Sequence, residues 1–330
     1  MTAPAAPVSH QNPTLGILFV LAGVFAISIN DMLIKELSGD YPLHQMVFTR
    51  SLIGILFTLI LVQMEGGWRI LRTDRPFLHF IRGLLVVVAN MTFFAALAVL
   101  PLAEATALFF AAPLMITLLS IPILGEKVGP LRLGAVLLGF VGVLIMQRPW
   151  AAGSDLSVSR IVLLLPVLAA FTYALMQIMT RKLGVNSKAS ALSVYIQATF
   201  IAVGLGFYVV AGDGRYAEGV TNESLVFLLR AWAWPQSTDI WFFLGLGLNS
   251  AIVGYTLSAA YRMADAGVIA PFEYVGLPLA VLWGWLFFAE LPTLPVWLGM
   301  ALIAGSGLFV FLRERQKERL LASRQANRRY

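Results

Sequence analysis

The chain has 330 residues, of which 59% are hydrophobic and only 12% carry a charge. A soluble domain has about 25% charged residues, so a soluble enzyme or binding domain is excluded. The chain contains no cysteine, which excludes disulfides, thiolate metal sites and cysteine nucleophiles. The net charge of +6 does not indicate a nucleic-acid partner, because the basic residues lie at the ends of apolar stretches and in the tail.

Ten apolar stretches of about twenty residues follow one another along nearly the whole chain. A bilayer core about 30 Å thick requires about 20 helical residues to cross it. Lipid offers no hydrogen-bond partners, so each stretch is expected to be a helix. We therefore predict an all-α integral membrane protein with ten transmembrane helices. The predicted spans are 14–36, 42–63, 77–99, 102–124, 130–147, 159–183, 188–211, 239–262, 266–289 and 294–312.

Lysine and arginine are unevenly distributed between the two sides of this arrangement. With the N-terminus in the cytoplasm, sixteen of the 23 basic residues lie on the cytoplasmic side and five on the other side. This bias predicts that both termini lie in the cytoplasm. The membrane is expected to be the inner membrane of a cell. The first thirteen residues carry no Lys or Arg, unlike a signal peptide, so the first span is expected to be retained.

An internal repeat divides the chain into two five-span units. Lys35 and Arg181 occupy matching positions 146 residues apart, and Glu126 and Glu290 match at 164 residues. Because five is an odd number, the second unit must cross the membrane in the opposite direction, as in the inverted repeats of secondary transporters. We therefore predict two inverted five-helix repeats. The predicted units are 14–147, 159–312 and a basic cytoplasmic tail, 313–330, close to anionic membrane lipid.

Two segments, 96–146 and 259–310, each contain a proline-bearing span, a Gly-Glu or Ala-Glu ending and a final span with spaced glycines. In these features the chain resembles the EamA-like ten-span branch of the drug/metabolite transporter superfamily, over nearly all of residues 14–312. The resemblance implies transport of a small metabolite, commonly an amino acid or a related compound. It also implies a central cavity walled by spans 1–4 and 6–9, with spans 5 and 10 bracing the two halves from behind.

Ionisable residues inside spans are informative, because a charge at the bilayer centre costs about 2.5–3.5 kcal/mol. Asp31 and Arg50 both lie in the outer part of the bilayer on consecutive helices, so we predict that they are paired directly or through water. Asn30, beside Asp31, is expected to face the same cavity. The alternative is that Asp31 pairs with Lys35, one turn along its own helix.

Arg82 and Glu273 share a depth in the inner part of the bilayer, so a pair between them is predicted. The alternative for Arg82 is that its side chain extends to the phosphates of the inner leaflet. Glu273 has no short route to water, so it is expected to bind substrate, carry a proton or gate the cavity.

Neutral polar side chains within the spans are further candidates for substrate binding. The alternative is that they form hydrogen bonds between helices. These candidates are Asn90, Gln177, Tyr195, Gln197, Asn249, Tyr255 and Tyr274.

Two features outside this set carry structural predictions. Prolines remove a backbone hydrogen bond and bend a helix, so kinks are expected at Pro113, Pro271 and Pro278. The segment 222–234 is apolar and is expected to form a short helix on the outer surface.

Together these patterns predict a secondary transporter that moves a small polar or amphipathic metabolite by alternating access, with proton coupling through Glu273 or Asp31 as a hypothesis. The expected partners are a small-molecule substrate, membrane lipid and protons. No zinc-protease or hydrolase motif and no P-loop is present, so neither an enzyme nor a cofactor or metal is expected. The alternative is a lipid-translocating protein or a membrane assembly protein without transport activity.

Overall fold

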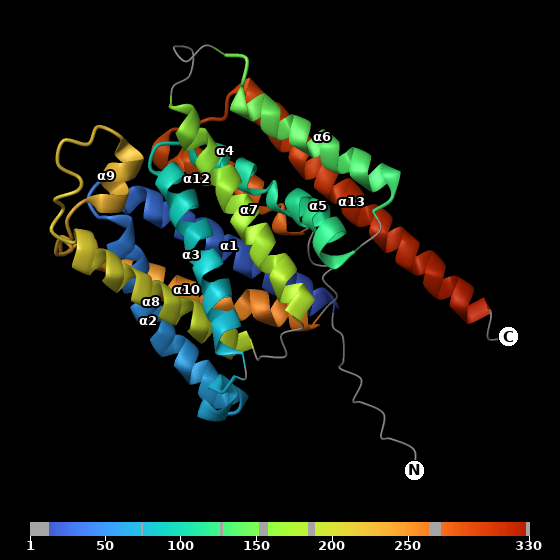
Figure 1. Cartoon of the computed structure of the whole chain (residues 1–330), viewed down its shortest axis with the longest axis horizontal. Helices are drawn as coiled ribbons and strands as arrows, with labels where there is room; N and C mark the ends of the chain where they lie inside the picture. Colours follow the sequence, from blue (N-terminus) through green and yellow to red (C-terminus); the bar gives the residue numbers. More distant parts are fainter. Residues whose placement is uncertain are drawn as a thin grey trace.

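The computed structural model describes residues 13–73, 75–125, 128–151, 158–183, 189–263 and 272–327. Within these residues every regular element is a helix (Figure 1). Nine spans among them are long and apolar enough to cross a membrane, and a shorter apolar helix occupies the ninth predicted span. The predicted fold class, an all-α membrane protein with ten helices, is confirmed.

The helices follow the predicted spans closely. In the first half they are α1 (Pro13–Leu37), α2 (Leu43–Glu65), α3 (Pro76–Leu97), α4 (Leu102–Phe109), α5 (Ala112–Leu124) and α6 (Pro130–Gln147). In the second half they are α7 (Arg160–Leu183), α8 (Ala189–Ala211), α10 (Ile240–Met263), α12 (Gly276–Phe288) and α13 (Leu294–Asn327). Two short helices are the 3-10 helix η1 (Trp68–Leu71) and α9 (Glu223–Leu229). Thus α13 continues the last span into the basic tail.

Local sequence explains several helix ends. Proline is the first residue of both α3 and α6, where its missing N–H would have no partner in any case. Gly125 ends α5 in the left-handed conformation, with φ of 70°. Glu126 and Pro271, which took part in the predicted repeat and kinks, lie outside the described residues.

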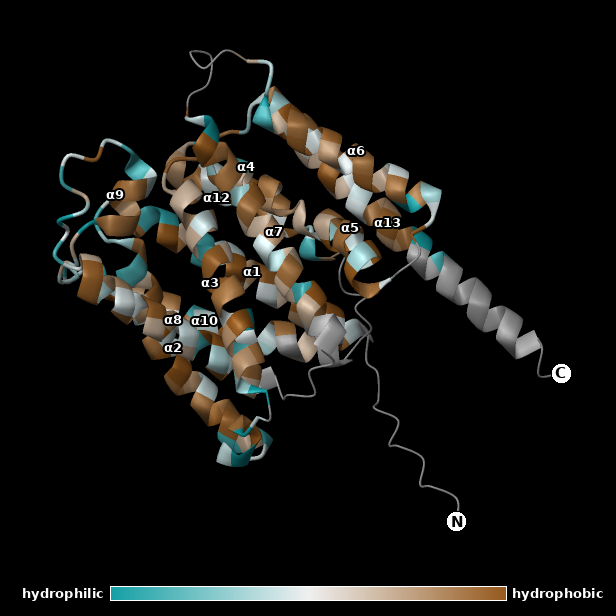
Figure 2. Cartoon of the chain, in the orientation of Figure 1, coloured by the Kyte–Doolittle hydropathy of each residue, from teal (hydrophilic) through white to brown (hydrophobic). Residues whose placement is uncertain are grey.

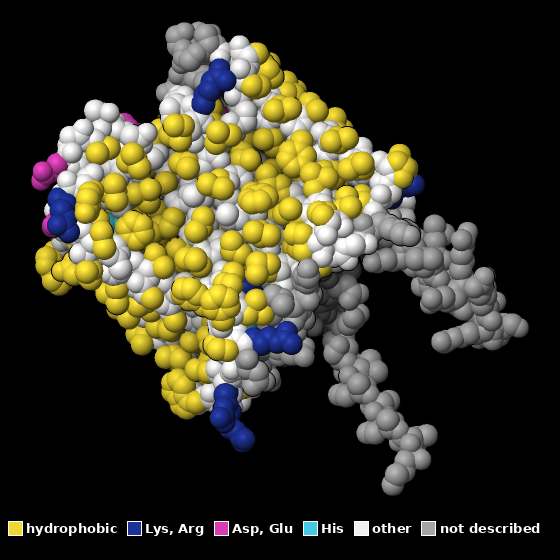
Figure 3. Space-filling view, viewed as in Figure 1, with side chains coloured by type: hydrophobic (Ala, Val, Ile, Leu, Met, Phe, Trp, Pro, Cys, Tyr) yellow, Lys and Arg dark blue, Asp and Glu magenta, His cyan; other side chains and the backbone are white. Residues whose placement is uncertain are grey.

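The surface agrees with a membrane location. Hydrophobic residues cover the outer faces of the helices, and hydrophilic residues gather at helix ends and in the connecting segments (Figure 2). In Figure 3 the visible Lys and Arg side chains lie at the rim of a broad hydrophobic face. Leu56 is 61% exposed and Val209 is 77% exposed, which suits contact with lipid chains rather than water.

Every spanning unit of the first half packs against one of the second half. The pairs are α1 with α10, α2 with α8, α3 with α7, α4 with α12, and α6 with α13. This set of pairs is unchanged when each span is exchanged for its counterpart five spans away.

Helices α6 and α13 form a separate pair alongside the rest of the bundle (Figure 1). Gly142 of α6 meets Gly299 of α13 so closely that a Cβ added at either residue would lie 2.9 Å from the carbonyl oxygen of the other. Small residues permit this approach of two backbones in lipid. Gly307 makes room for the ring of Tyr274, whereas Gly134 has open space around it.

The fourth and ninth spans are broken rather than only kinked. Between α4 and α5 the chain makes a turn at Phe110 and Ala111, and Pro113 lies in the first turn of α5. Proline has no N–H to offer the carbonyl four residues earlier, so the helix cannot run through. A matching turn at Tyr274 and Val275 precedes α12.

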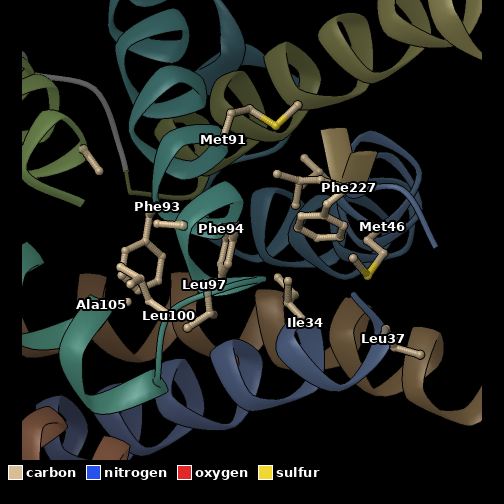
Figure 4. Packing of buried hydrophobic residues seen from close by; sticks show 14 of the residues in the cluster. Ile34, Leu37, Met46, Met91, Phe93, Phe94, Leu97, Leu100, Ala105 and Phe227 are labelled. Carbon is tan, nitrogen blue, oxygen red and sulfur yellow. The ribbon is translucent and has the colours of Figure 1, made fainter. Parts of the chain in front are cut away.

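The largest buried cluster lies where α1 ends and α2 begins. Phe93, Phe94 and Leu97 of α3 pack there with Ile34 of α1 and with Phe227 of α9 (Figure 4). Helix α9 covers only part of the predicted 222–234 helix. Its Phe227 is 1% exposed and anchors it to the bundle.

A candidate substrate cavity

A cavity of about 460 Å³ lies inside the bundle, between helices of both halves. Its volume falls in the range of about 300–1,000 Å³ that is typical of small-molecule sites. Helices α1, α2, α3, α4, α5, α7, α8 and α10 contribute to its wall, together with the start of α12. Its polar side chains other than tyrosine are Ser28, Asn30, Asp31, Arg50, Asn90, Thr106, Ser250 and Glu273.

One face of α3 forms a continuous part of this wall. Val86, Ala89, Asn90, Phe93 and Phe94 all line the cavity. Their spacing of three and four residues places them on the same side of the helix. The wall is therefore apolar at both ends of the stripe and polar at Asn90.

Three polar side chains of the lining lie at the same depth. Asp31 is six residues before the end of α1, Arg50 seven after the start of α2, and Asn90 seven before the end of α3. At a rise of 1.5 Å per residue each lies about 10 Å from that end of the bundle. We call this end, where α1 ends and α2 begins, the α1–α2 end.

Arg50 joins these side chains into one hydrogen-bonded cluster. Its Nη1 donates to Oδ1 of Asn30 at 3.3 Å, and its Nη2 donates to Oδ1 of Asn90 at 3.1 Å. The Nδ2 of Asn30 donates in turn to Oδ1 of Asp31 at 3.3 Å. The structure thus places Asp31 near Arg50, but they are linked through the side chain of Asn30 and not by the direct or water-mediated pair that was predicted.

Two aromatic rings complete the surroundings of Arg50, which is 7% exposed. Its guanidinium carbon lies 5.7 Å from the ring centre of Phe94 and 5.5 Å from that of Phe200. Cation–π contact and the two amide oxygens offset part of the cost of burying this charge. One edge of the cavity therefore carries donors, acceptors and both signs of charge within one cluster.

Aromatic rings form much of the remaining wall. The ring centres of Phe93 and Phe109 are 5.3 Å apart, and those of Phe109 and Tyr173 are 5.5 Å apart. Phe94 packs edge-on against Phe93 at 5.3 Å, and Phe110 follows at the break between α4 and α5. These rings offer apolar faces to a flat ligand.

Glu273 lines the opposite end of the cavity, just before α12. Tyr173 also lines that part, and its hydroxyl accepts a hydrogen bond of 2.9 Å from Gln177, one turn along α7. Ser28 accepts a hydrogen bond of 2.9 Å from the indole N–H of Trp283. Gln177 thus supports a lining residue without lining the cavity.

At the α1–α2 end, the ion pair of Lys35 and Glu290 is joined by hydrogen bonds to the backbone of Leu100 and Leu102. We call this group of contacts the latch. Lys35 Nζ lies 2.9 Å from Oε1 of Glu290 and donates to the carbonyl of Leu100 at 2.6 Å. The backbone N–H of Leu102 donates to Oε2 of Glu290 at 3.2 Å. The alternative that Lys35 pairs with Asp31 is wrong, because Lys35 instead ties α1 to the links before α4 and after α12.

Arg82 and Tyr195 lie outside the cavity lining. Arg82 is 8% exposed and lies close to His79, whose ring packs against Tyr195 at 4.5 Å. The hydroxyl of Tyr195 donates to the carbonyl of Leu71 at 2.5 Å. Glu273 lines the cavity and Arg82 does not, and the Arg82–Glu273 pair stays a prediction.

Two predicted amides join helices instead of lining the cavity. Gln197 donates to the hydroxyl of Thr58 at 2.9 Å and connects α8 with α2. Asn249 donates to the carbonyl of Ala26 at 2.5 Å and connects α10 with α1. These contacts match the alternative that intramembrane amides form hydrogen bonds between helices.

The two remaining tyrosines also lie outside the lining. Tyr255 is 45% exposed on the outer surface of the bundle, where its ring meets Phe19 edge-on at 6.1 Å. Tyr274 packs behind the cavity, with its ring 5.3 Å from that of Phe110. Five of the twelve candidates therefore line the cavity: Asn30, Asp31, Arg50, Asn90 and Glu273.

Sequence reasoning missed the aromatic wall and Thr106. Phenylalanine in an apolar span carries no signal of its own, because lipid-facing and cavity-facing rings look alike in sequence. The spacing of Asn90 to Phe93 and Phe94 was the available hint, since residues three and four positions apart share a helix face.

A membrane-spanning helix bundle that encloses a cavity with a charged cluster and aromatic walls is the architecture of a small-metabolite transporter. The model of the EamA-like transporter family matches residues 14–148. A riboflavin transporter of Vibrio cholerae is 31% identical, covering 94% of this chain and 97% of that protein. The chain belongs to the EamA-like transporter family, within the drug/metabolite transporter superfamily, and is a transporter rather than an enzyme.

Other similar proteins fit this family. A riboflavin transporter of Rhizobium johnstonii is 29% identical, covering 97% of this chain and 98% of that protein. An S-adenosylmethionine uptake transporter of Rickettsia prowazekii is 26% identical, covering 91% and 94%. One solved structure, 19% identical, has a TM-score of 0.63 over 92% of this chain and 99% of that one, which shows the shared fold.

Proposed function

We propose that this protein carries a planar heteroaromatic metabolite of the flavin type across the membrane. The observation that carries the proposal is the wall of rings, Phe93, Phe109 and Tyr173, beside the polar cluster of Arg50. A flat ring system stacks on such faces, while its nitrogen and oxygen atoms form hydrogen bonds with the cluster. The similarity to two riboflavin transporters over nearly the whole chain supports the same substrate class.

An amino acid, the substrate class expected from the family resemblance, suits this cavity less well. A small zwitterion would contact Arg50 and Asp31 but would leave much of the aromatic wall without a partner. Apolar surface contributes to binding in proportion to the area covered, which favours the larger aromatic ligand.

Alternating access is proposed as the mechanism, with two inverted five-helix repeats, 14–147 and 159–312, as the moving parts. Three features support it: the symmetric pairing of helices, the breaks in the fourth and ninth spans beside the cavity, and the latch at one end. Broken helices at a central site are typical of secondary transporters. Both termini are proposed to lie in the cytoplasm, so that the latch closes the outer side of the inner membrane.

Uptake of riboflavin by proteoliposomes tests the proposed function. Saturable uptake is expected with the purified protein and not with empty liposomes. Phe109→Leu removes a ring of the wall while keeping apolar volume, and is expected to lower the apparent affinity about fivefold. Phe57→Leu is the matched control, because Phe57 is 41% exposed on α2 and lies outside the cavity lining.

Three outcomes separate the alternatives. Absence of saturable riboflavin uptake, with uptake of an amino acid instead, would overturn the flavin proposal. Movement of a labelled phospholipid between leaflets, without solute uptake, would favour the lipid-translocating alternative. Riboflavin uptake that no longer responds to an imposed pH gradient in Glu273→Gln would support proton coupling at that residue.

A further inference from the structure

Thr106 is a buried residue of the cavity lining whose hydroxyl has no hydrogen-bond partner. It lies in α4, is 8% exposed and lines the cavity. Its Oγ1 has no partner within the part of the chain that the structure describes. An unpaired buried hydroxyl is unfavourable, because it has lost its hydrogen bonds with water.

Six other threonines of the spans avoid this loss by bonding within their own helix. Serine and threonine in helices commonly donate to the carbonyl four residues earlier. The threonines that do so here are Thr58, Thr92, Thr117, Thr172, Thr199 and Thr256. Thr106 departs from this pattern at a position that lines the cavity, so its hydroxyl remains available to a ligand.

The surroundings of Thr106 indicate which kind of ligand group would bond to its hydroxyl. Thr106 lies four residues after the start of α4, about 6 Å from the α1–α2 end, and the Arg50 cluster lies at about 10 Å. The latch lies at this end, and Leu102, one turn before Thr106, belongs to both the latch and the lining. Thr106 and the cluster therefore provide the polar groups in the part of the cavity nearest the α1–α2 end, where Phe93 and Phe94 also line it.

This part of the cavity presents a mixture of donors and acceptors. Arg50 donates, the carboxylate of Asp31 accepts, and the amide of Asn90 can do both. A phosphate group would meet the carboxylate of Asp31 unfavourably, whereas hydroxyl groups, which both donate and accept, match the whole set. Rings lie close to these polar groups, since Phe109 lines the cavity one turn along α4 from Thr106 and Phe94 packs against Arg50.

We propose that Thr106 hydrogen-bonds a hydroxyl group of the substrate's side chain, so that the transporter prefers a heteroaromatic ring carrying a polyhydroxyl chain over the bare ring. The chain lies beside Thr106 and the Arg50 cluster, and the ring lies between the aromatic side chains. This inference rests on the proposed function and adds the residue that recognises the polyhydroxyl chain of the substrate.

Binding of two flavins to the purified full-length protein tests the proposal. Riboflavin carries a ribityl chain, and lumiflavin has the same ring system with a methyl group in its place. Thr106→Val keeps the shape of the side chain and removes the hydroxyl. It is expected to weaken riboflavin binding about tenfold, the loss of about one hydrogen bond, and to leave lumiflavin binding unchanged.

Two further variants control for packing. Thr172→Val is matched, because Thr172 is also 8% exposed but donates to the carbonyl of Leu168. It is expected to bind both flavins as the wild type does. Thr106→Ser restores a hydroxyl, and it is expected to recover the preference for riboflavin over lumiflavin.

The outcomes distinguish the inference from the proposed function. If the wild type binds riboflavin, but Thr106→Val weakens the binding of both flavins equally or of neither, Thr106 does not recognise the ribityl chain. The inference then fails while the proposed function stands. If the wild type binds neither flavin, the proposed substrate class fails and the inference fails with it.

Discussion

Removing the charge of Glu290 is expected to open the α1–α2 end of the cavity. In the latch, Lys35 Nζ lies 2.9 Å from Glu290 Oε1, and the other carboxylate oxygen accepts from the N–H of Leu102. Glu290→Gln keeps the shape and one oxygen acceptor but leaves Lys35 without its counter-charge. The closed arrangement of α1, α4 and α12 then loses its ionic contact.

The exposure of the pair sets the size of the effect. The side chain of Lys35 is 10% exposed and that of Glu290 is 28% exposed. Breaking a buried pair costs about 3–5 kcal/mol, and an exposed pair contributes at most about 1 kcal/mol. A pair between these limits is expected to stabilise the closed state by about 2 kcal/mol. The equilibrium between closed and open forms then shifts about thirtyfold, since 1.4 kcal/mol corresponds to tenfold.

A single cysteine in the cavity reports the opening. The chain contains no cysteine of its own, so Ala89→Cys, at a buried residue of the lining, gives a unique thiol. A membrane-impermeant maleimide is applied to intact cells and, separately, to inside-out vesicles. In the Glu290→Gln background the thiol is expected to react about thirtyfold faster from the side of the α1–α2 end.

Two controls make the result specific. Asp213→Asn removes the exposed pair between Arg215 and Asp213, at 3.4 Å, and is expected to leave the labelling rate unchanged. Exchanging the charges, with Lys35→Glu and Glu290→Lys in one protein, is expected to slow labelling again. An equal increase from both sides of the membrane, or no increase at all, would show that the latch does not close this end.

Two other substitutions test the cavity and the packing behind it. Arg50→Gln is expected to weaken riboflavin binding about thirtyfold, because charged hydrogen bonds contribute about 1.5–3 kcal/mol. Arg82→Gln, outside the cavity lining, is expected to change riboflavin binding little. Equal losses of binding in the two variants would contradict the assigned lining. Gly142→Ala is expected to destabilise the protein by about 1–3 kcal/mol, because its Cβ would lie 2.9 Å from the Gly299 carbonyl. Gly134→Ala, with open space around it, is the control, and a similar drop in thermal unfolding temperature would disprove the packing argument.

The sequence predicted the spans well because the relevant physics is local. Each span must be apolar over about twenty residues, and each helix satisfies its own backbone hydrogen bonds in lipid. The same length argument placed Asp31 and Arg50 at a common depth, since depth follows from counting residues along a helix. Their link through Asn30 was not local, because α1 and α2 both pack against α10 rather than against each other, and the long side chain of Arg50 spans the distance.

The tertiary structure decided which side chains face the cavity and which partners they meet. Lys35 pairs with Glu290 from the far end of the chain, and Asn249 bonds to a carbonyl of α1. Each of these contacts depends on how helices of the two halves are rotated and packed against each other. In a membrane span nearly every face is apolar, so the sequence pattern does not reveal how each helix is rotated. The aromatic wall and the unpartnered hydroxyl of Thr106 therefore became visible only in the tertiary structure.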